Sequence, residues 1–252
     1  MKGFVKKAGF LLLAVGLLWQ FGVAGEASAA APQGKTEQVN NVLDRLVTVQ
    51  TVGDYDDQAA RDMVYRVWNI HPNILVALDK AGVEVKFINF PLTDLPEYAY
   101  LKGVVPRGWE HTGYTWDDVP GAGGKTVVAR IGYSDSGNMH SSLNLELHET
   151  AHAIDYYVFG NISYSEDFKR IHSEERLGFS DNPYYSYPEE YFAETFAYYH
   201  RGEESREHLK AVAPKTYEFM DKLYRNIPNH GRETAKERSA KMQEYRVHPL
   251  AS

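Results

Sequence analysis

The chain of 252 residues contains no cysteine. Disulfide bonds therefore cannot stabilise it, and any metal site must be built from histidine and carboxylate side chains. Positive charge is not in excess either: the formal net charge is −7 at pH 7, which disfavours binding to nucleic acid. Without cross-links, stability must come from buried apolar surface, for which 18 Tyr, 11 Phe and 4 Trp supply ample area.

Long apolar runs are missing except at the N-terminus. Three early lysines precede an apolar run over residues 8–23, and the small residues Ala27-Ser28-Ala29 follow it. This order predicts a signal peptide over residues 1–29, cleaved after Ala29; an uncleaved anchor is the alternative. Since no later segment is apolar enough to cross a bilayer, we expect residues 30–252 to form one secreted, extracellular domain without stable membrane insertion.

The periodicity of the apolar residues predicts a helix-rich α+β chain. Steps of three and four residues indicate helices, and runs of β-branched residues indicate strands. The expected helices cover residues 36–47, the region around 63–68, 73–80, a segment from Ser141 or Ser142 to about Phe159, 188–202 and 213–226. Strands are expected at 83–88 and 126–131, and the Pro- and Gly-rich residues 91–124 indicate ordered loops.

The strongest chemical signal is the run His148-Glu149-Thr150-Ala151-His152 inside one of these helices. Residues four apart lie on one helical face, so both imidazoles can bind a single Zn²⁺ ion. Glu149 is then placed to act as general base on a metal-bound water. The alternative is an accidental pair of surface histidines beside a solvated glutamate.

Two histidines leave a catalytic zinc site one protein ligand short. A third histidine in the longer version of this motif would fall at position 158, with a glycine at 155, but the chain has Val158 and Asp155 there. The expected third ligand is a glutamate from a second helix, at Glu190 or its neighbour Glu189. Because Glu194 lies one turn beyond Glu190, it can accept a hydrogen bond from a ligating histidine.

These acidic residues also have a simpler interpretation. Carboxylates at the start of a helix complement the helix dipole, whether or not they bind a metal. The three neighbouring tyrosines at 184, 185 and 187 also have two possible interpretations. One hydroxyl could stabilise the oxyanion of a peptidase, but tyrosine-rich loops more often serve packing.

Several separated motifs resemble the catalytic domain of anthrax toxin lethal factor and, among its relatives, the small exported Pro-Pro endopeptidases. They are the run HETAH at 148–152, the segment EYFAETF at 190–196 and the segment APKTY at 213–217, and Glu190 follows His148 at a spacing of forty-two residues. The resemblance covers nearly all of residues 30–252. It implies a two-lobed, gluzincin-like zinc metallopeptidase domain, with a small sheet above the active-site helix and a helical lobe below.

The resemblance also implies roles for individual residues. His148, His152 and Glu190 match the family's ligands for one Zn²⁺ ion per chain, Glu149 its general base, and Glu194 the carboxylate behind a ligand. Tyr184 resembles the oxyanion tyrosine, because it follows His148 by thirty-six residues as in the Pro-Pro enzymes. It precedes Glu190 by six residues where the family has seven, so Tyr185 remains an alternative.

Residues of the substrate cleft follow from the same comparison. Trp109 resembles the aromatic residue that lines the cleft, and a flat indole suits proline rings. Arg107 takes the place of a basic residue that pairs with a carboxylate such as Glu189. The alternatives are core packing for Trp109 and an ordinary surface charge for Arg107. The strand at 126–131 could bind an extended peptide along its edge, with the Gly-rich loop before it shaping the non-primed subsites.

The expected function is therefore that of a secreted zinc endopeptidase that cleaves between two prolines in exported or surface proteins. The partner is an extended, proline-containing peptide, and no nucleic acid is expected. One alternative is a metallopeptidase of the same fold with other specificity. Another is a catalytically inactive binding module, although the intact metal and base residues disfavour it. A toxin acting inside host cells is less favoured, because no delivery domain is recognisable.

Overall fold

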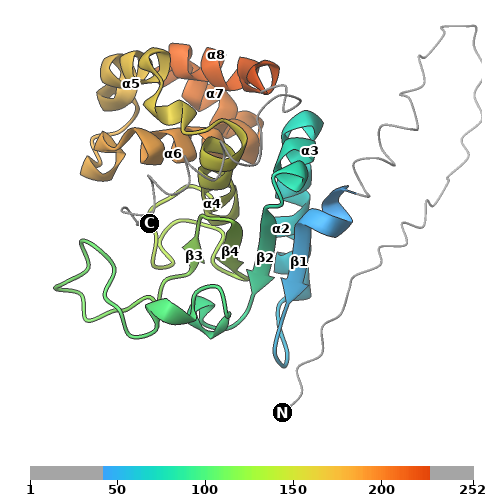
Figure 1. The fold of residues 1–252 in the computed structure, drawn as a ribbon. Coiled ribbons are helices and arrows are strands. Elements are labelled where there is room, and N and C mark those ends of the chain that lie inside the picture. Colours follow the sequence, from blue (N-terminus) through green and yellow to red (C-terminus); the bar gives the residue numbers. More distant parts are fainter. Residues whose placement is uncertain (1–41, 228–252) are drawn as a thin grey trace, which may run out of the picture.

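The computed structural model describes residues 42–227, so the expected signal peptide at 1–29 lies outside the described residues. A four-stranded sheet has the order β1-β2-β4-β3, in which β1, β2 and β4 are parallel and β3 is antiparallel to β4 (Figure 1). The strands are β1 (Val47–Gln50), β2 (Glu84–Ile88), β3 (Gly121–Ala122) and β4 (Thr126–Arg130).

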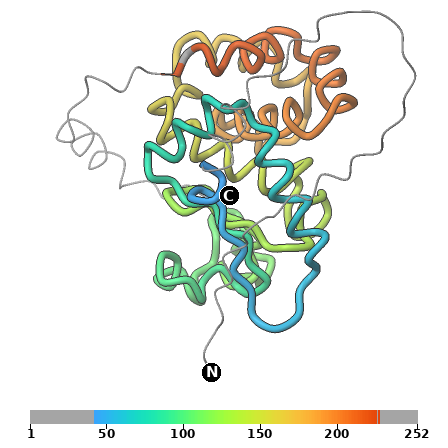
Figure 2. Tube along the Cα trace, turned by 90° about the vertical axis from the view of Figure 1, so that its right-hand side faces the viewer, coloured from blue at the N-terminus to red at the C-terminus, as the bar shows by residue number. Residues whose placement is uncertain are grey.

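The helices form two groups along the chain. Those before the last strand are α2 (Asp57–Trp68) and α3 (Pro72–Lys80), which connect β1 to β2. After the sheet come α4 (Leu145–Ala153), α5 (Glu166–Phe179), α6 (Pro188–Arg201), α7 (Glu203–Val212) and α8 (Pro214–Lys222). Figures 1 and 2 both show the yellow-to-red helices α5 to α8 gathered at one end of the molecule, away from the sheet. The predicted helix-rich α+β fold with a small sheet is confirmed.

Side chains that alternate along the strands divide the interior into two cores. Phe87, Val127 and Ala129 belong to the larger core, which includes α2, α3, α4 and α6. Ile88 and Val128 point to the opposite face. There they contact apolar residues of the loop segment 92–119, so this Pro- and Gly-rich segment covers the sheet instead of projecting into solvent.

Helix α4 lies between the sheet and the helical end of the molecule, and all nine of its residues are buried. Its N-cap is Asn144, whose side chain accepts a hydrogen bond from the Leu147 amide, so the expected cap at Ser141 or Ser142 is wrong. The helix continues into a π-helical turn, Ile154–Val158, and stops at Phe159 as predicted. Gly160, with φ of +65°, provides the left-handed backbone that ends it.

Three other predictions differ from the structure. Val47 lies in strand β1, where the helical spacing predicted a helix, because its β-branched side chain pairs with β2. The sequence patterns did not predict β3, α5 or α7. Strand β4 is not an edge strand, since β2 and β3 occupy both of its sides; the edge beside it belongs to Gly121 and Ala122 of β3.

The apolar pattern did not predict α5 and α7, because these helices bury few apolar residues. In α5, the buried side chains are Phe168 and Glu175. Glu175 caps α8: it accepts hydrogen bonds from the amides of Lys215 and Thr216 at 2.9 and 2.8 Å. The Thr216 hydroxyl, which is fully buried, also lies 2.8 Å from that of Tyr191 in α6. These contacts connect the APKTY segment to α6.

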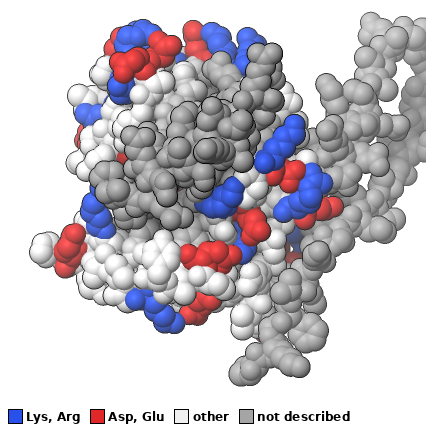
Figure 3. All heavy atoms as spheres, viewed as in Figure 1, with Lys and Arg blue, Asp and Glu red and all other residues white. Residues whose placement is uncertain are grey.

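The surface and helix lengths give two general observations. Within residues 42–227, no helix has both the length and the apolar character needed to cross a membrane. On the face shown in Figure 3, the described basic and acidic side chains are interspersed, without a patch of one sign.

A buried ion pair connects α2 to the start of α4. Arg66 binds Glu146, whose side chain is inaccessible to solvent, and donates a second hydrogen bond to Ser134 at 2.9 Å. Asn144, the cap of α4, also donates to Glu146 at 3.0 Å. Glu146 therefore depends on Arg66 and Asn144 for its compensation.

We expect Arg66→Met to lower the free energy of unfolding by about 3–5 kcal/mol, because it leaves the Glu146 charge buried without its ionic partner. Adding Glu146→Gln should recover a large part of this loss, since the uncompensated charge is then gone. Urea unfolding followed by circular dichroism measures both variants. Arg45→Met, which removes an ion pair exposed to solvent, is the matched control and should change stability far less. Equal losses for the two arginine variants would contradict this account.

Candidate active site

The HETAH run lies in the buried middle of the fold. His148 and His152 are each 5% exposed and Glu149 is 2% exposed, which excludes an accidental pair of surface histidines. These side chains occupy successive turns of α4, whose neighbours are β4 on one side and α6 on the other. Burial of two imidazoles and a carboxylate is costly unless partners compensate for it.

His148, His152 and Glu190 converge on one point. Each offers a ligand atom, and these three atoms lie within 4.8 Å of one another. The Nε2 atoms of the two histidines are 3.2 Å apart, and Oε2 of Glu190 lies 3.2 Å from Nε2 of His148 and 3.4 Å from Nε2 of His152. Two imidazole nitrogens and one carboxylate oxygen are a donor set suited to zinc. The sequence left Glu189 as a rival to Glu190, but Glu189 is not part of this cluster.

The charges of the cluster are strongly coupled. Burial lowers the pKa of His148, but hydrogen bonds with Glu190 and Glu194 outweigh it and raise this pKa to about 10. For Glu190, burial raises the pKa, but its interactions with the two histidines outweigh burial and lower this pKa well below its usual range. The site therefore holds Glu190 as a carboxylate that requires positive charge beside it. Protons on the histidines meet that requirement, and a divalent cation between the same atoms would meet it equally.

Glu194 lies behind His148, as its position one turn after Glu190 predicted. Its Oε2 is 3.0 Å from Nδ1 of His148, and its Oε1 accepts a hydrogen bond of 2.8 Å from the Leu143 amide. When Nδ1 carries the proton that Glu194 accepts, Nε2 is left to face Glu190 and His152. The second carboxylate of the EYFAE segment thus fixes both the ring orientation and the loop before α4.

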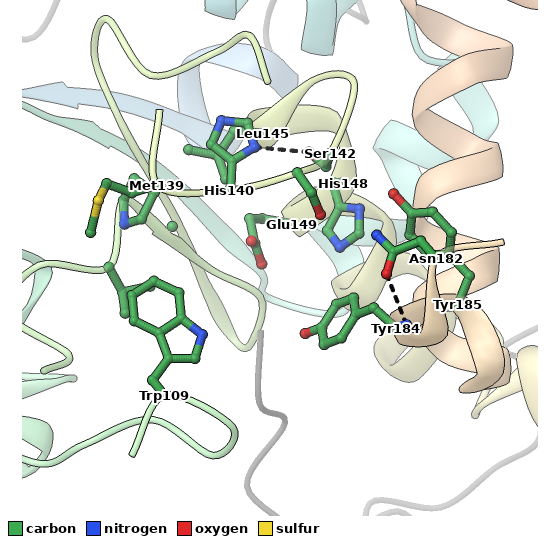
Figure 4. A pocket seen from close by; sticks show the side chains of 14 residues that line it. Trp109, Met139, His140, Ser142, Leu145, His148, Glu149, Asn182, Tyr184 and Tyr185 are labelled. Atoms are coloured by element: carbon green, nitrogen blue, oxygen red, sulfur yellow. Dashed lines mark hydrogen bonds between the residues drawn. The ribbon is translucent and has the colours of Figure 1, made fainter. Parts of the chain in front are cut away.

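Glu149 opens onto a pocket of about 280 Å³. Figure 4 shows its carboxylate between Trp109 on one side and Tyr184 on the other, with His148 next to it. Burial raises the pKa of Glu149. Its Oε2 atom is buried and has no hydrogen-bond partner in the described part of the chain. A buried carboxylate oxygen aimed into a cavity is available to take a proton from a molecule bound there.

The two candidate tyrosines differ in what they face. Burial raises the pKa of Tyr184, and the charges of Glu190 and Glu149 raise it further, so this phenol lies beside the cluster and stays protonated. Tyr185 interacts with Glu194 and Ser141 instead, and it is 5% exposed. The structure thus brings Tyr184, and not Tyr185, to the side of Glu149.

Trp109 lies where the pocket meets the smaller core. It lines the pocket, and part of its ring packs against the smaller core, 6.2 Å from the ring of Tyr114. Arg107 is exposed, and its guanidinium lies 5.3 Å from the centre of the Tyr187 ring. The expected Arg107–Glu189 pair is not among the ion pairs of residues 42–227; the Tyr164 hydroxyl donates to Glu189 at 2.5 Å instead.

Two glycines explain how the sheet edge approaches the active-site helix. A Cβ atom on Gly121 would lie 2.8 Å from a Leu145 methyl carbon, and one on Gly123 would lie 2.6 Å from Cβ of His152. Side chains at these positions would therefore push β3 and its loop away from α4. Glycine at both positions brings the edge of β3 against the pocket.

The pocket also includes residues to which the sequence assigned no role in the site. Met139, His140 and Ser142 line the pocket on a loop in which Nε2 of His140 donates to the Tyr133 carbonyl and Nδ1 of His140 accepts from the Ser142 hydroxyl. Met139 has a φ of +66°, unusual outside glycine. No pattern in the sequence indicated that this loop lines the same pocket as Glu149. Tyr164 was missed as well, because a single tyrosine in a loop carries no pattern.

Comparisons with known proteins agree with this geometry. The family model of the anthrax toxin lethal factor N- and C-terminal domain matches residues 33–223. A Pro-Pro endopeptidase of Clostridioides difficile is 48% identical over 197 residues, covering 78% of this chain and 89% of that protein. A Pro-Pro endopeptidase of Paenibacillus alvei is 46% identical over 199 residues, covering 78% and 90%.

A solved structure extends the likeness to three dimensions. The structure of a Pro-Pro endopeptidase from Paenibacillus alvei superposes with a TM-score of 0.69 at 46% identity, covering 72% of this chain and 99% of that one. The residues that the family model matches, 33–223, include the segment that carries the His148, His152 and Glu190 cluster. The chain belongs to the anthrax toxin lethal factor family and is a metalloendopeptidase of that family.

Proposed function

We propose that this chain is a secreted zinc endopeptidase that hydrolyses the bond between two prolines in exported or cell-surface proteins. One observation carries the proposal. His148, His152 and Glu190 converge in the buried interior, next to a Glu149 carboxylate whose Oε2 has no hydrogen-bond partner among the described residues. The specificity is supported by relatives that are 46–48% identical and are themselves Pro-Pro endopeptidases.

In this proposal, His148, His152 and Glu190 hold one Zn²⁺ ion, and Glu194 orients His148. Bound zinc would lower the pKa of a coordinated water and polarise the scissile carbonyl. The protein supplies the groups that this chemistry needs: two imidazole Nε2 atoms, one carboxylate ligand, and a pocket beside them that Glu149 lines.

Glu149 takes a proton from the attacking water and passes it to the nitrogen of the departing proline. Its raised pKa suits both steps. A carboxylate with a higher pKa is a stronger base, and the protonated form that donates the proton back has a pKa nearer to the operating pH. The Tyr184 hydroxyl donates a hydrogen bond to the oxyanion that forms on the carbonyl. Because its pKa is raised, Tyr184 keeps its proton for this purpose.

The substrate is an extended peptide with two adjacent prolines. Trp109 offers an indole face against which a proline ring can pack. Gly121 and Gly123 bring β3 close to α4. Because β3 is at the end of the described sheet, its outer edge can pair with the backbone of the peptide. Proline lacks an amide hydrogen, so such pairing would involve the residues on either side of the Pro-Pro pair.

We expect purified protein of residues 30–252 to cleave quenched peptides between two prolines, and Glu149→Ala to lower kcat/KM by about 10²–10⁴-fold, the usual contribution of a general base. Mass spectrometry of the products locates the cut. The experiment uses a peptide library in which the residues around a Pro-Pro pair vary. Zinc chelation should abolish cleavage, and added Zn²⁺ should restore it.

Each outcome of that experiment has a distinct meaning. Cleavage only at other bonds would retain the peptidase and discard the Pro-Pro specificity. Full activity of Glu149→Ala would remove the general base from the proposal. A zinc-loaded protein that cuts no member of the library would contradict the proposed specificity.

The choice between the two tyrosines can be tested with a matched pair of variants. Tyr184→Phe should lower kcat by about 10²–10³-fold, because it removes one oxyanion donor, with a smaller effect on KM. Tyr185→Phe loses a buried hydroxyl of the same kind beside Glu194, and we expect it to change kcat far less. Steady-state kinetics of both variants measure these changes. A larger loss of kcat in Tyr185→Phe than in Tyr184→Phe would assign the oxyanion donor to Tyr185.

Secretion is a separate part of the proposal, resting on the order of charge, apolar run and small residues at 1–29. Expression of the full chain in a secreting bacterial host should release a protein whose N-terminal residue is Ala30. N-terminal sequencing of protein from the culture medium checks this. Recovery of the intact chain in the membrane fraction would support the uncleaved anchor.

A further inference from the structure

The loop at 161–164 is tied to the end of the active-site helix. Asp155 lies in the π-helical turn, three residues after His152, and is 3% exposed. Its Oδ1 accepts the Ser163 amide at 2.9 Å, and its Oδ2 accepts the Ser163 hydroxyl at 2.5 Å. The Asn161 amide also donates to the Asp155 carbonyl at 2.8 Å. Because Ser163 is completely buried, this clamp sets the position of the residue that follows it.

That residue, Tyr164, reaches the start of α6. Its hydroxyl donates to Oε2 of Glu189 at 2.5 Å, although half of its side chain is exposed. Burial raises the pKa of Tyr164, the hydrogen bond to Glu189 raises it further, and the charge of Glu190 contributes as well. Tyr164 therefore remains a donor and lies close to both neighbouring carboxylates.

Two adjacent carboxylates at a metal cluster create an ambiguity. Glu189 and Glu190 are adjacent in α6 and differ by about one-third of a helical turn, so a change of the Glu189 rotamer is the movement that would bring its carboxylate towards the cluster. Arg107 does not restrain Glu189, since its guanidinium lies over the Tyr187 ring. The hydrogen bond that the structure gives to the Glu189 carboxylate comes from Tyr164.

We propose that Tyr164 is a positioning residue: held by the Asp155–Ser163 clamp, its hydroxyl keeps the Glu189 carboxylate away from the His148–His152–Glu190 cluster. Glu190 alone then faces the histidines, and the position next to Glu149 stays open for water. This inference rests on the proposed function, because it concerns the metal ligands of the same site. Tyr164 acts through Glu189 and does not itself contact the reacting atoms.

The test compares Tyr164→Phe with the wild type after substitution of the metal by Co²⁺, whose visible absorption weakens as its coordination number rises. Tyr164→Phe removes the hydroxyl, so we expect Glu189 to enter the cluster as an additional ligand. The absorption should fall, and kcat on the Pro-Pro peptide should fall by about fivefold, the equivalent of one lost hydrogen bond. In a Glu189→Ala background, Tyr164→Phe should change neither quantity.

Tyr199→Phe is the matched control. It removes a tyrosine hydroxyl that donates to Asp221 at 2.9 Å, ten residues further along α6 from Glu189. A general effect of losing a tyrosine–carboxylate hydrogen bond would appear in thermal unfolding of both variants. An effect on the Co²⁺ spectrum should appear in Tyr164→Phe only.

An unchanged spectrum in Tyr164→Phe would overturn the inference, as would an equal loss of kcat with Glu189 present and absent. A wild-type protein that binds no Co²⁺ would overturn the proposed function itself, and the positioning role with it. If Tyr164→Phe does not fold, Ser163→Ala takes its place, because it removes one of the two Ser163 bonds to Asp155 and leaves Tyr164 intact. It should weaken the spectrum in the same direction and to a smaller extent.

Discussion

The complete burial of α4 is the constraint on which the rest of the structure depends. This helix carries Glu146, His148, Glu149 and His152, all shielded from water. Since a buried ionisable group must be compensated, each of them determines what its neighbours must provide. Glu146 is matched by Arg66 from α2, and the histidines are matched by carboxylates from α6. The elements packed around α4 are thereby fixed by charge as well as by apolar contact.

Glu149 differs from the three residues of the His148–His152–Glu190 cluster in how it is compensated. One of its oxygens is buried without a partner in the described structure, while every ligand atom of the cluster has a neighbour within 3.4 Å. A buried polar atom without a partner destabilises the fold, and proteins keep such atoms mainly where function requires them. Trp109 and Tyr184 stand on either side of it, so the uncompensated carboxylate faces a cavity and not packed protein.

The sequence predicted what depends on local spacing. Four-residue spacing placed His148 and His152 on one helical face and Glu190 and Glu194 on another, and runs of β-branched and apolar residues located β2 and β4. It failed where local patterns are weak or conflict. Val47 fits a helical stripe and a β-branched run equally, and α5 and α7 bury too few apolar residues to produce a stripe. Asn144 capped α4 in preference to two serines that were equally suitable by type.

Choices between neighbouring residues were beyond sequence reasoning for a different reason. Glu189 or Glu190, and Tyr184 or Tyr185, are decided by the rotation of α6 and of the turn before it. That turn is set by contacts between distant parts of the chain: Glu194 with Leu143, His172 with the Tyr185 carbonyl, and Tyr164 with Glu189. Each of these joins residues at least thirteen positions apart, so no local pattern contains them. Which carboxylate lies beside His148 and His152 is thus a property of the tertiary structure and not of the local sequence.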